Sequence, residues 1–557
     1  MTSEETPDRT PGTIIPVPDN FPIEWPHPED AALHWTLDAD EPGPLLHPSS
    51  DWPRRGIAHA QRYWLGPFEE IRELRIHGYD YSTRVPLAAD AEEFKDRAAR
   101  AADALSHLID HIESQWERDW YPRIRQSLNA FDAFEPRTAS DTELARAIAG
   151  ASAPGRELWA VHFELVYGCG YIRRQFDQYC REVFGDATEL GTATLTAGDH
   201  NWSVAGGEAL RELARFAQAW PDLCSAILEP SSEGVHDFRE LPGGVEFEQR
   251  LDAFVVQFGK KLTAGLTGAT WDEDRRLPLE NLGALLKMGG DLGAGRRAQV
   301  VAEKERLLTE ARGRLADLPR VVATEFERLY RSAAFATRLM EDHNYYIDQQ
   351  SAYYHRRLVI EAARRLHRTG RLRAVADVEL LTETEVERAL IDLRLNPAAL
   401  VQQRREEMAR WKDCTPPREL GTVAPPPPPH PLFGSQGLPE ATPSGDGEPG
   451  VFRGLAASRG TVRARVRVVK NLALASALQP GEILVTTITS PSWATWYPIL
   501  GGLVTESGGI LSHAAVVARE YGIPAVVGLK QATAALHTGD VVELDGAAGT
   551  IRRLEPA

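Results

Sequence analysis

The sequence predicts a large, mainly α-helical region followed by a small domain of mixed α/β (β/β/α) structure. Three observations lead to this fold class. Before residue 420, apolar residues recur at steps of three and four over long stretches, as on the buried face of an amphipathic helix. After residue 450, short apolar and β-branched runs lie beside Gly or Pro. Between these regions, 15 of the 30 residues at 421–450 are Pro or Gly, which is typical of a semi-rigid linker.

Length and composition narrow the class of protein. A chain of 557 residues is too long for one hydrophobic core, so several domains are expected. The net charge of −18 argues against nucleic acid as a partner. No apolar run is long enough to span a bilayer, and the acidic, polar N-terminus does not resemble a signal peptide. The four cysteines show no CxxC pair and no zinc spacing. We therefore expect a cytoplasmic protein with reduced thiols and no membrane partner.

The changes in pattern divide the chain into four segments. Residues 1–90 are rich in Pro and Trp and weakly periodic, which predicts an N-terminal cap or an irregular subdomain. Residues 91–420 form the helical region, residues 421–450 the linker and residues 451–557 the C-terminal domain. Amphipathic helical stretches are predicted near 94–120, 141–165, 205–229, 300–317 and 320–366.

The pattern of the C-terminal domain predicts short strands separated by turns, with one helix at about Ala514–Tyr521. The predicted strands are Val462–Val469, Ile483–Thr487, Leu503–Thr505, Ala525–Val527 and Val541–Leu544. This order of elements predicts a compact α/β domain.

The loop before the predicted helix carries the residues with the clearest chemistry. Gly508 and Gly509 permit a tight turn, and His513 stands where the helix begins. Backbone N–H groups and the positive helix end converge at such a position, which favours an anion such as a phosphoryl group. An imidazole placed there can act as a nucleophile and hold phosphate covalently. A structural histidine that caps the helix is the alternative that these residues alone leave open.

Two other chemistries fit His513 poorly. A metal site would need two or three more ligands, and no cluster of Cys, His or Asp surrounds this residue. A serine hydrolase would need a G-x-S-x-G turn, which Ser512 lacks. We therefore expect no metal at this site.

The segment from Thr505 to Gly528 resembles the phosphohistidine motif in the swivelling domain of the PEP-utilising enzyme family. The resemblance runs from about residue 454 to 552 and includes Ala457–Gly460, Thr487–Trp493 and Gly539–Gly546. Rifampin phosphotransferase and phenylphosphate synthase carry related domains. The resemblance implies that His513 is the phosphorylated histidine. It also implies that the usual neighbours in the phosphohistidine loop are Thr505, Gly508, Gly509, Ser512 and Arg519.

The family phosphorylates its histidine with an ATP-grasp domain or with a C-terminal barrel, and we find neither pattern in this sequence. The glycine-rich run Gly289–Arg296 lacks the Gly-Lys-Ser/Thr ending of a P-loop, so a loop is its expected structure. The resemblance therefore implies a separate ATP-grasp partner as phosphoryl donor. ATP and Mg²⁺ are expected through that partner, and no cofactor is expected to bind this chain directly.

The helical region is similar, more loosely, to the substrate-binding domain of the same relatives. The similarity rests on Leu195–Asn201, Phe254–Lys261, Glu341–Asp348 and Asp377–Leu381. There is one departure, because Lys260 and Lys261 stand where relatives often have His-Arg followed by an acidic residue.

Helical periodicity over 335–358 predicts a pocket wall. Plotted on a helix, His343 and Gln350 share a broad inward face with tyrosines, and buried polar groups need partners. His343 is thus a candidate base for an acceptor hydroxyl, and a satisfied core histidine is the alternative. The tyrosines are Tyr346, Tyr353 and Tyr354.

Charged residues near this face complete the candidate site. The family pattern makes Glu341 a catalytic candidate and Asp342 its neighbour in the acceptor pocket, although periodicity places Glu341 on the opposite side from His343 with Asn344, Tyr345 and Asp348. Arg338, Lys260 and Lys261 are candidates to stabilise the charge of a transferred phosphoryl group. The alternative is that these three residues are solvated surface charges.

These features predict a phosphotransferase component with a phosphohistidine intermediate. His513 would carry a phosphoryl group from ATP to a hydroxyl or enol of a small aromatic or amphipathic molecule. Two alternatives stay open. Phosphorylation could activate the acceptor for dehydration or another later step, or the chain could be a regulatory phosphocarrier without a small-molecule acceptor.

Overall fold

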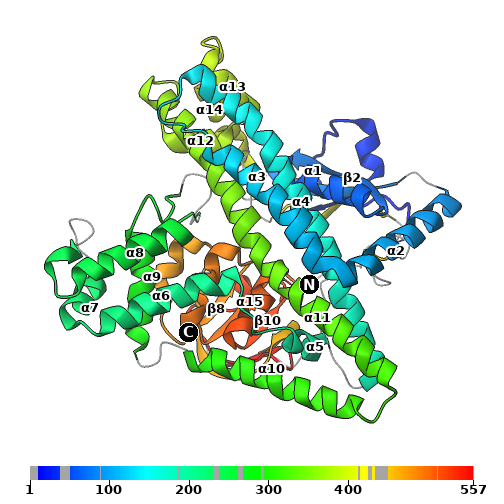
Figure 1. The fold of residues 1–557 in the computed structure, drawn as a ribbon. Coiled ribbons are helices and arrows are strands. Elements are labelled where there is room, and N and C mark those ends of the chain that lie inside the picture. The colour runs from blue at the N-terminus through cyan, green and yellow to red at the C-terminus, as the bar shows by residue number, and fades with distance from the viewer. Residues whose placement is uncertain are drawn as a thin grey trace. The chain divides into compact units, whose positions relative to one another are not determined.

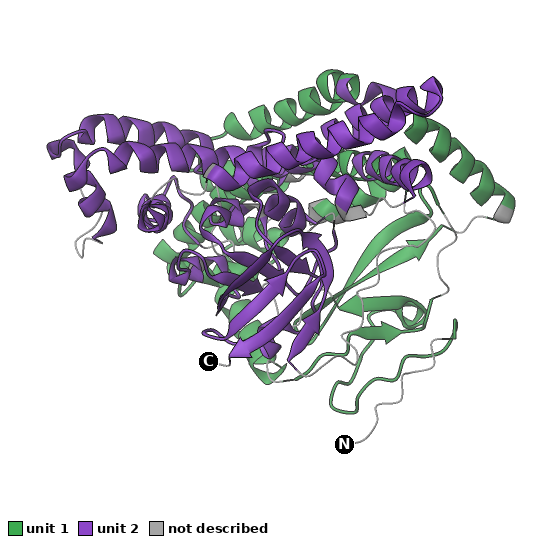
Figure 2. Ribbon diagram, turned by 90° about the horizontal axis from the view of Figure 1, so that it is seen from below, with its two compact units in different colours: residues 1–108, 114–168, 351–438 green, residues 109–113, 169–350, 439–557 purple. Residues whose placement is uncertain are grey.

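The computed structural model describes most of the chain, in two compact units (Figure 2). Unit 1 comprises residues 1–108, 114–168 and 351–438, and unit 2 comprises residues 109–113, 169–350 and 439–557. The described residues are 10–37, 51–87, 90–185, 189–229, 237–260, 262, 268–289, 294–411, 414–424, 430–432, 450–510 and 512–555.

Unit 1 contains a four-stranded antiparallel sheet of order β2-β3-β1-β4. The strands are β1 (His34–Leu37), β2 (Phe68–Ile76), β3 (Tyr79–Pro86) and β4 (Glu419–Gly421). Buried Trp35, Tyr79 and Tyr81 form its core with Phe21. An irregular subdomain is therefore wrong for the described part of residues 1–90. The side chains of β2 and β3 alternate along a regular sheet, and β4 joins this sheet from far along the chain.

The predicted linker at 421–450 begins later than its composition suggests. Gly421 ends β4, and the backbone N–H of Gly12 donates to Val423 O at 2.9 Å. His430 is 3% exposed, and one ring nitrogen lies 3.1 Å from Leu65 O. These parts of the segment are held on unit 1 by backbone pairing and burial, while residues 425–429 and 433–449 lie outside the described residues.

The helices of unit 1 enclose a buried ion cluster. Glu164 has a fully buried side chain, and its carboxylate accepts two bonds from Arg123, at 2.8 and 2.9 Å. His59 and the indole of Trp120 also contact this carboxylate, at 2.6 and 3.0 Å. The helices with residues in unit 1 are α1 (Asp51–Tyr63), α2 (Ala91–Gln115), α3 (Tyr121–Asp132), α4 (Asp141–Phe184), α12 (Gln350–Arg368), α13 (Glu383–Ile391) and α14 (Pro397–Trp411).

Unit 2 combines helices with the C-terminal α/β domain, which confirms the predicted fold class (Figure 1). A π-helical turn at Asn344–Gln349 follows α11. The C-terminal part of α4 belongs to this unit as well. The other helices before the C-terminal domain are α5 (Glu189–Leu195), α6 (Trp202–Gln218), α7 (Pro221–Leu228), α8 (Gly244–Phe258), α9 (Arg276–Met288), α10 (Ala294–Leu315) and α11 (Arg320–His343).

The C-terminal domain is built on an eight-stranded sheet of order β5-β12-β11-β7-β8-β9-β10-β6. Strands β7 to β10 run parallel, and the other pairs are antiparallel. Each strand and the helix expected from the sequence form within about two residues of the predicted bounds. The prediction missed strands β5, β6 and β12 and the short helix α16. The elements are β5 (Val451–Arg453), β6 (Leu455–Ser458), β7 (Thr461–Val468), β8 (Ile483–Thr486), β9 (Gly502–Thr505), α15 (His513–Tyr521), β10 (Ala525–Val527), α16 (Ala532–Ala535), β11 (Val541–Asp545) and β12 (Thr550–Glu555).

The helices of unit 2 and the C-terminal domain share one hydrophobic cluster. Val204 of α6 and Leu285 of α9 belong to it, and so do Trp496, Ala518 and Tyr521 of the C-terminal domain. In Figure 1 the orange-to-red domain lies beside the green helices α6, α9 and α10. Burial of this shared surface sets α15, and therefore His513, against the helical part of the unit. None of the helices in the described part of the chain is both long and apolar enough to cross a membrane.

Candidate active site

The candidate site begins where the parallel strands β8 and β9 end, at the paired residues Thr486 and Thr505. The chain leaves β9 through a short loop and enters α15 at His513. Gly508 has φ +106°, and a Cβ atom added there would lie 2.9 Å from the hydroxyl of Ser512. The loop therefore needs glycine at this position, as the sequence predicts.

His513 is held by one ring nitrogen and leaves the other without a partner. Its Nδ1 lies 3.0 Å from Oε2 of Glu341 on α11, and both side chains are mostly buried, at 13% and 1% exposed. Ser203 Oγ donates to the same carboxylate oxygen at 2.7 Å. Within the described residues, His513 Nε2 and the adjacent Ser512 Oγ are buried and have no hydrogen-bond partner.

The contact with Glu341 fixes which ring nitrogen bears the proton. Because a carboxylate only accepts hydrogen bonds, the proton at the 3.0 Å contact belongs on Nδ1 of His513. The amide of Asn344 lies farther from the same nitrogen, at 3.4 Å. In the neutral imidazole the lone pair is then on Nε2, which is the form that a nucleophile requires.

The placement of Glu341 corrects the prediction from periodicity. On the helical projection Glu341 and Asn344 lie away from the expected pocket face, yet they are 1% and 6% exposed. The C-terminal domain covers that side of α11, and a periodicity plot of one helix does not contain this information. The π-helical turn at Asn344–Gln349 then changes the register of the residues that follow.

His343 is buried, and its Nδ1 lies 3.1 Å from the carbonyl oxygen of Leu339, one turn earlier on α11. The proton of this contact is on Nδ1, so the lone pair of the neutral ring is on Nε2. Gln350 donates to the carbonyl oxygen of Tyr345 at 3.4 Å. These contacts fit a satisfied core histidine and also a base, so its catalytic role stays a prediction.

Asp342 lies beside the site without contacting His513 in the described structure. It accepts a hydrogen bond from the backbone N–H of Trp202 at 2.9 Å, and Arg338 Nε lies 3.4 Å from its other oxygen. Burial raises the pKa of Asp342 to about 6, although the Trp202 N–H and the Arg338 charge oppose this shift. The guanidinium of Arg338 also lies 4.4 Å from the ring centroid of Phe335.

An aromatic cluster stands next to these carboxylates. The ring of Trp202 stacks on Tyr345 with centroids 4.2 Å apart, and Tyr346 meets Trp202 edge-on at 5.8 Å. The hydroxyl of Tyr345 donates to Gln257 O at 3.0 Å, which ties the π-helical turn to α8. Trp202 and Tyr345 thus pack face to face beside Asp342, whose carboxyl accepts from the Trp202 N–H.

The remaining predicted pocket residues are placed as follows. Tyr353 and Tyr354 belong to unit 1, where Tyr354 stacks on Phe131 and donates to Asp132. Lys260 is partly buried near the end of α8, and Lys261 lies outside the described residues. Their roles stay predictions.

The other predicted loop residues support the backbone around His513. Thr505 Oγ1 donates to Ser507 O at 2.8 Å. The guanidinium of Arg519 is buried and donates to Ala457 O at 2.7 Å and to Ile510 O at 2.8 Å. Arg519 thus joins β6 to the loop, which is a supporting role.

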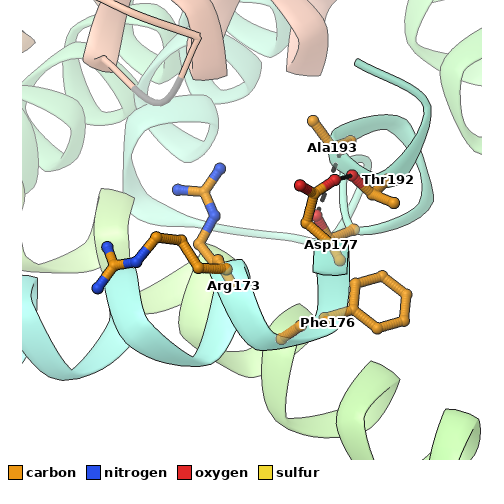
Figure 3. A pocket seen from close by; sticks show the side chains of 8 residues that line it. Arg173, Phe176, Asp177, Thr192 and Ala193 are labelled. Atoms are coloured by element: carbon orange, nitrogen blue, oxygen red, sulfur yellow. Dashed lines mark hydrogen bonds between the residues drawn. The ribbon is translucent and has the colours of Figure 1, made fainter. Parts of the chain in front are cut away.

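Sequence reasoning missed Ser203 and Asn344 as neighbours of His513. Ser203 is in the first turn of α6, directly after the motif Leu195–Asn201, and Asn201 caps that helix by accepting from Val204 N at 3.0 Å. The position of Ser203 directly after this motif was the sequence feature that could have identified it. Elsewhere in unit 2 a cavity of about 30 Å³ lies among Arg173, Phe176, Asp177 and Thr192, and its lining does not include His513 or Glu341 (Figure 3).

Comparison with known families matches two parts of the chain. Residues 478–549 match a family described as "PEP-utilising enzyme, mobile domain". The chain carries a PEP-utilising mobile domain. Residues 163–341 match a second family, described as "Rifampicin phosphotransferase fourth domain". The mobile domain contains His513, and the fourth-domain match ends at Glu341, so the contact between these two residues joins the two matched regions.

Three relatives show how the matches are distributed. Chondramide synthase of Chondromyces crocatus is 31% identical over 99% of this chain and 14% of its own length. A rifampicin phosphotransferase of a Streptomyces species is 32% identical over 67% of this chain and 42% of its own length. A prodigiosin synthesizing transferase of Serratia marcescens is 47% identical over 20% of this chain and 12% of its own length. The chain thus spans less than half the length of these relatives. The match to the PEP-utilising mobile domain and the similarity to rifampicin phosphotransferase support phosphoryl transfer as the chemistry.

Proposed function

We propose that the chain is a phosphotransferase component in which Nε2 of His513 carries the phosphoryl group. The observation that carries this proposal is the asymmetric environment of the ring. Nδ1 is engaged by Glu341 at 3.0 Å, whereas Nε2 and the Ser512 hydroxyl are buried without partners in the described structure. Both atoms lie at the start of α15, where backbone N–H groups and the helix dipole favour an anion.

The proposed first step loads the histidine. The phosphorus–oxygen bond of the nucleotide breaks, a bond from phosphorus to Nε2 of His513 forms, and the nucleotide leaves with the bridging oxygen. ATP and Mg²⁺ would be supplied by a separate ATP-grasp partner, as the family resemblance implies. On this chain, Ser512 Oγ can donate to a phosphoryl oxygen, and Gly508 keeps that hydroxyl unobstructed.

The proposed second step transfers the group to a small molecule bound by the helical part of unit 2. The phosphorus–Nε2 bond breaks, a bond to the acceptor oxygen forms, and the acceptor proton passes to a base, for which His343 is the candidate. Glu341 holds the Nδ1 proton, so the histidine leaves as a neutral imidazole. The cluster of Trp202, Tyr345 and Tyr346 supports an aromatic acceptor with a hydroxyl or enol oxygen.

A second candidate function keeps the phosphate as an activating group. A relative that matches 99% of this chain is named a synthase, and a relative that is 47% identical over 110 residues is named a synthesizing transferase. These names favour phosphorylation that prepares an acceptor for a later dehydration or bond-forming step. A stable phosphate ester as product would support the first function, and free phosphate with a converted product would support the second. The non-enzymatic alternative, a regulatory phosphocarrier, predicts a labelled His513 with no small-molecule product.

The test is to incubate the purified chain with ATP labelled at the β or γ phosphate, with and without a candidate ATP-grasp partner. We expect an acid-labile, base-stable label on the wild type that requires the partner. His513→Ala should abolish the label. His537→Ala is the matched control, because His537 lies in the same domain with a side chain that is 68% exposed. Equal labelling of His513→Ala and the wild type would refute the proposal. Labelling of the wild type without a partner would contradict the hypothesis of a separate phosphoryl donor.

A further inference from the structure

Glu520 lies on the same helix as His513 and is buried against the helical part of unit 2. It is 2% exposed, and its carboxylate oxygens accept from the backbone N–H of Gly198 at 3.1 and 3.2 Å. Arg297 of α10 lies 3.2 Å from one of these oxygens. Each of these partners comes from outside the mobile domain, so the carboxylate of Glu520 is part of the surface by which the mobile domain docks.

Arg297 links this carboxylate to a second helix. Its Nε lies 2.8 Å from an oxygen of Glu208 on α6, and the arginine side chain is only 14% exposed. The preceding residue, Arg296, donates to the carbonyl oxygens of Leu500 at 2.7 Å and Pro498 at 2.5 Å. Two consecutive arginines of α10 thus bind the mobile domain at two separate places.

Close packing accompanies these polar contacts. A Cβ atom added at Gly207 of α6 would lie 2.0 Å from the hydroxyl oxygen of Tyr521, the residue after Glu520. The hydroxyl of Tyr521 donates to Val204 O at 3.4 Å. Glycine at position 207 therefore lets α15 approach α6 closely enough for the ion pair to form.

We infer that Arg296 and Arg297 of α10, with Glu520 as the partner of Arg297, are positioning residues that hold the mobile domain where His513 meets Glu341. This inference rests on the proposed function for its purpose, since a phosphoryl carrier must dock at the acceptor and then leave. Guanidinium groups suit such a clamp, because they are more weakly hydrated than ammonium groups and can donate to several acceptors at once. The clamp acts on the position of His513 and does not touch the reacting atoms.

The charge of Glu520 makes the clamp sensitive to pH. Burial raises the pKa of Glu520 to about 7, the charge of Arg297 and the Gly198 N–H oppose the shift, and the charge of Glu341 on α11 adds to it. Glu208 lies on the far side of Arg297. Docking raises the pKa of Glu520 from 4.5 to about 7, so the protonated carboxyl favours the docked state. This stabilisation of docking is complete below pH 4.5 and is lost as the pH rises through about 7. Docking should therefore weaken as the pH is raised from mildly acidic to mildly alkaline values.

The experiment measures amide hydrogen exchange of α15 in the full chain, corrected for the intrinsic effect of pH on exchange. In the wild type, exchange of α15 should rise as the pH is raised from about 6 to about 8. Glu520→Gln should remove this pH dependence, since the amide keeps the shape but does not titrate. At the higher pH, Arg297→Met should raise exchange about tenfold, because the buried carboxylate loses its charged partner.

The double variant Arg297→Met/Glu520→Gln separates a charge effect from lost packing. Its exchange should return close to that of the wild type, because no buried charge is left without a partner. Gly207→Ala supplies the undocked reference through its steric clash. Arg306→Met is the matched control, since Arg306 of α10 is exposed and, among the described residues, pairs with Glu303 and Glu310 of the same helix. An unchanged pH profile in Glu520→Gln, or no rescue in the double variant, would overturn the inference.

Labelling of His513 in the same variants keeps this test separate from that of the proposed function. The arginine and glutamate variants should still accept label from the donor, because loading does not use the docked position. If the wild type takes no label while exchange responds as expected, the proposed function fails and the clamp stands. If labelling succeeds while exchange does not respond, the clamp fails alone.

Discussion

Replacing Glu341 by glutamine should move the proton of His513 from Nδ1 toward Nε2. Glutamine has nearly the shape of glutamate, and Ser203 can still bond to it, so the fold should be retained. The carboxylate can only accept a hydrogen bond from Nδ1, whereas an amide can also present its NH₂ group to an unprotonated Nδ1. The variant thus loses both the charge and the directional preference that set the tautomer.

The size of the effect follows from the burial of the contact. Glu341 is 1% exposed and lies 3.0 Å from Nδ1, so solvent does not screen the pair. A hydrogen bond to a charged group contributes about 1.5–3 kcal/mol, and a neutral one about 0.5–1.5 kcal/mol. The midpoints of these ranges differ by about 1.2 kcal/mol, which corresponds to about an eightfold fall in the ratio of the Nδ1–H to the Nε2–H form.

Nitrogen-15 NMR of the imidazole ring measures this ratio directly, with His513→Ala used to assign the signals. Asp342→Asn is the control, because this neighbouring carboxyl accepts from Trp202 N and makes no described contact with His513. It should leave the ratio unchanged. If Glu341→Gln keeps the wild-type ratio, then Glu341 does not set the tautomer, and the argument for Nε2 as the phosphoryl carrier loses its basis.

Three further predictions concern the loop, a buried carboxyl and unit 1. Gly508→Ala should destabilise the phosphohistidine loop by about 1–3 kcal/mol and reduce labelling of His513, because φ is +106° there; Gly509→Ala, with open space at its Cβ position, should label normally. Asp342→Asn should raise the free energy of unfolding by about 2–3 kcal/mol at alkaline pH, since the pKa of Asp342 is raised from 3.8 to about 6. Urea titrations should show this gain disappearing as the pH falls through about 6 toward about 4, because the wild-type carboxyl is then protonated. Arg123→Met should cost about 3–5 kcal/mol in thermal unfolding, because it leaves the fully buried Glu164 without its main partner; a cost below about 1 kcal/mol would contradict this reading.

The C-terminal domain was the part of the fold most accessible from the sequence. Strands β8, β9 and β10 are continuous β-branched or apolar runs, because parallel strands are covered on both faces. Gly and Pro at their ends mark the turns. The missed strands β5 and β6 are short and partly exposed, so their pairing with β12 and β10 comes from distant partners and not from their own pattern.

Only part of the candidate site could be predicted from the sequence. His513 and its loop lie within one continuous motif, so their proximity follows from the chain itself. Glu341, Ser203 and Glu520 were harder to place, because their neighbours are more than 130 residues away in sequence. Helical periodicity placed Glu341 on the side of the helix away from His343, but it could not show that the C-terminal domain covers that side.

The sequence by itself determined the fold class, the mobile domain and its candidate phosphohistidine, because periodicity, turn residues and a local motif are properties of neighbouring residues. Only the tertiary structure decided which nitrogen of His513 is engaged, that Glu341 faces it, and that Arg297 meets Glu520. The physical reason is that hydrogen bonds and buried ion pairs depend on distances of about 3 Å between atoms from separate elements. Those distances are set by how α6, α10, α11 and α15 pack within unit 2, and packing is a property of the whole unit.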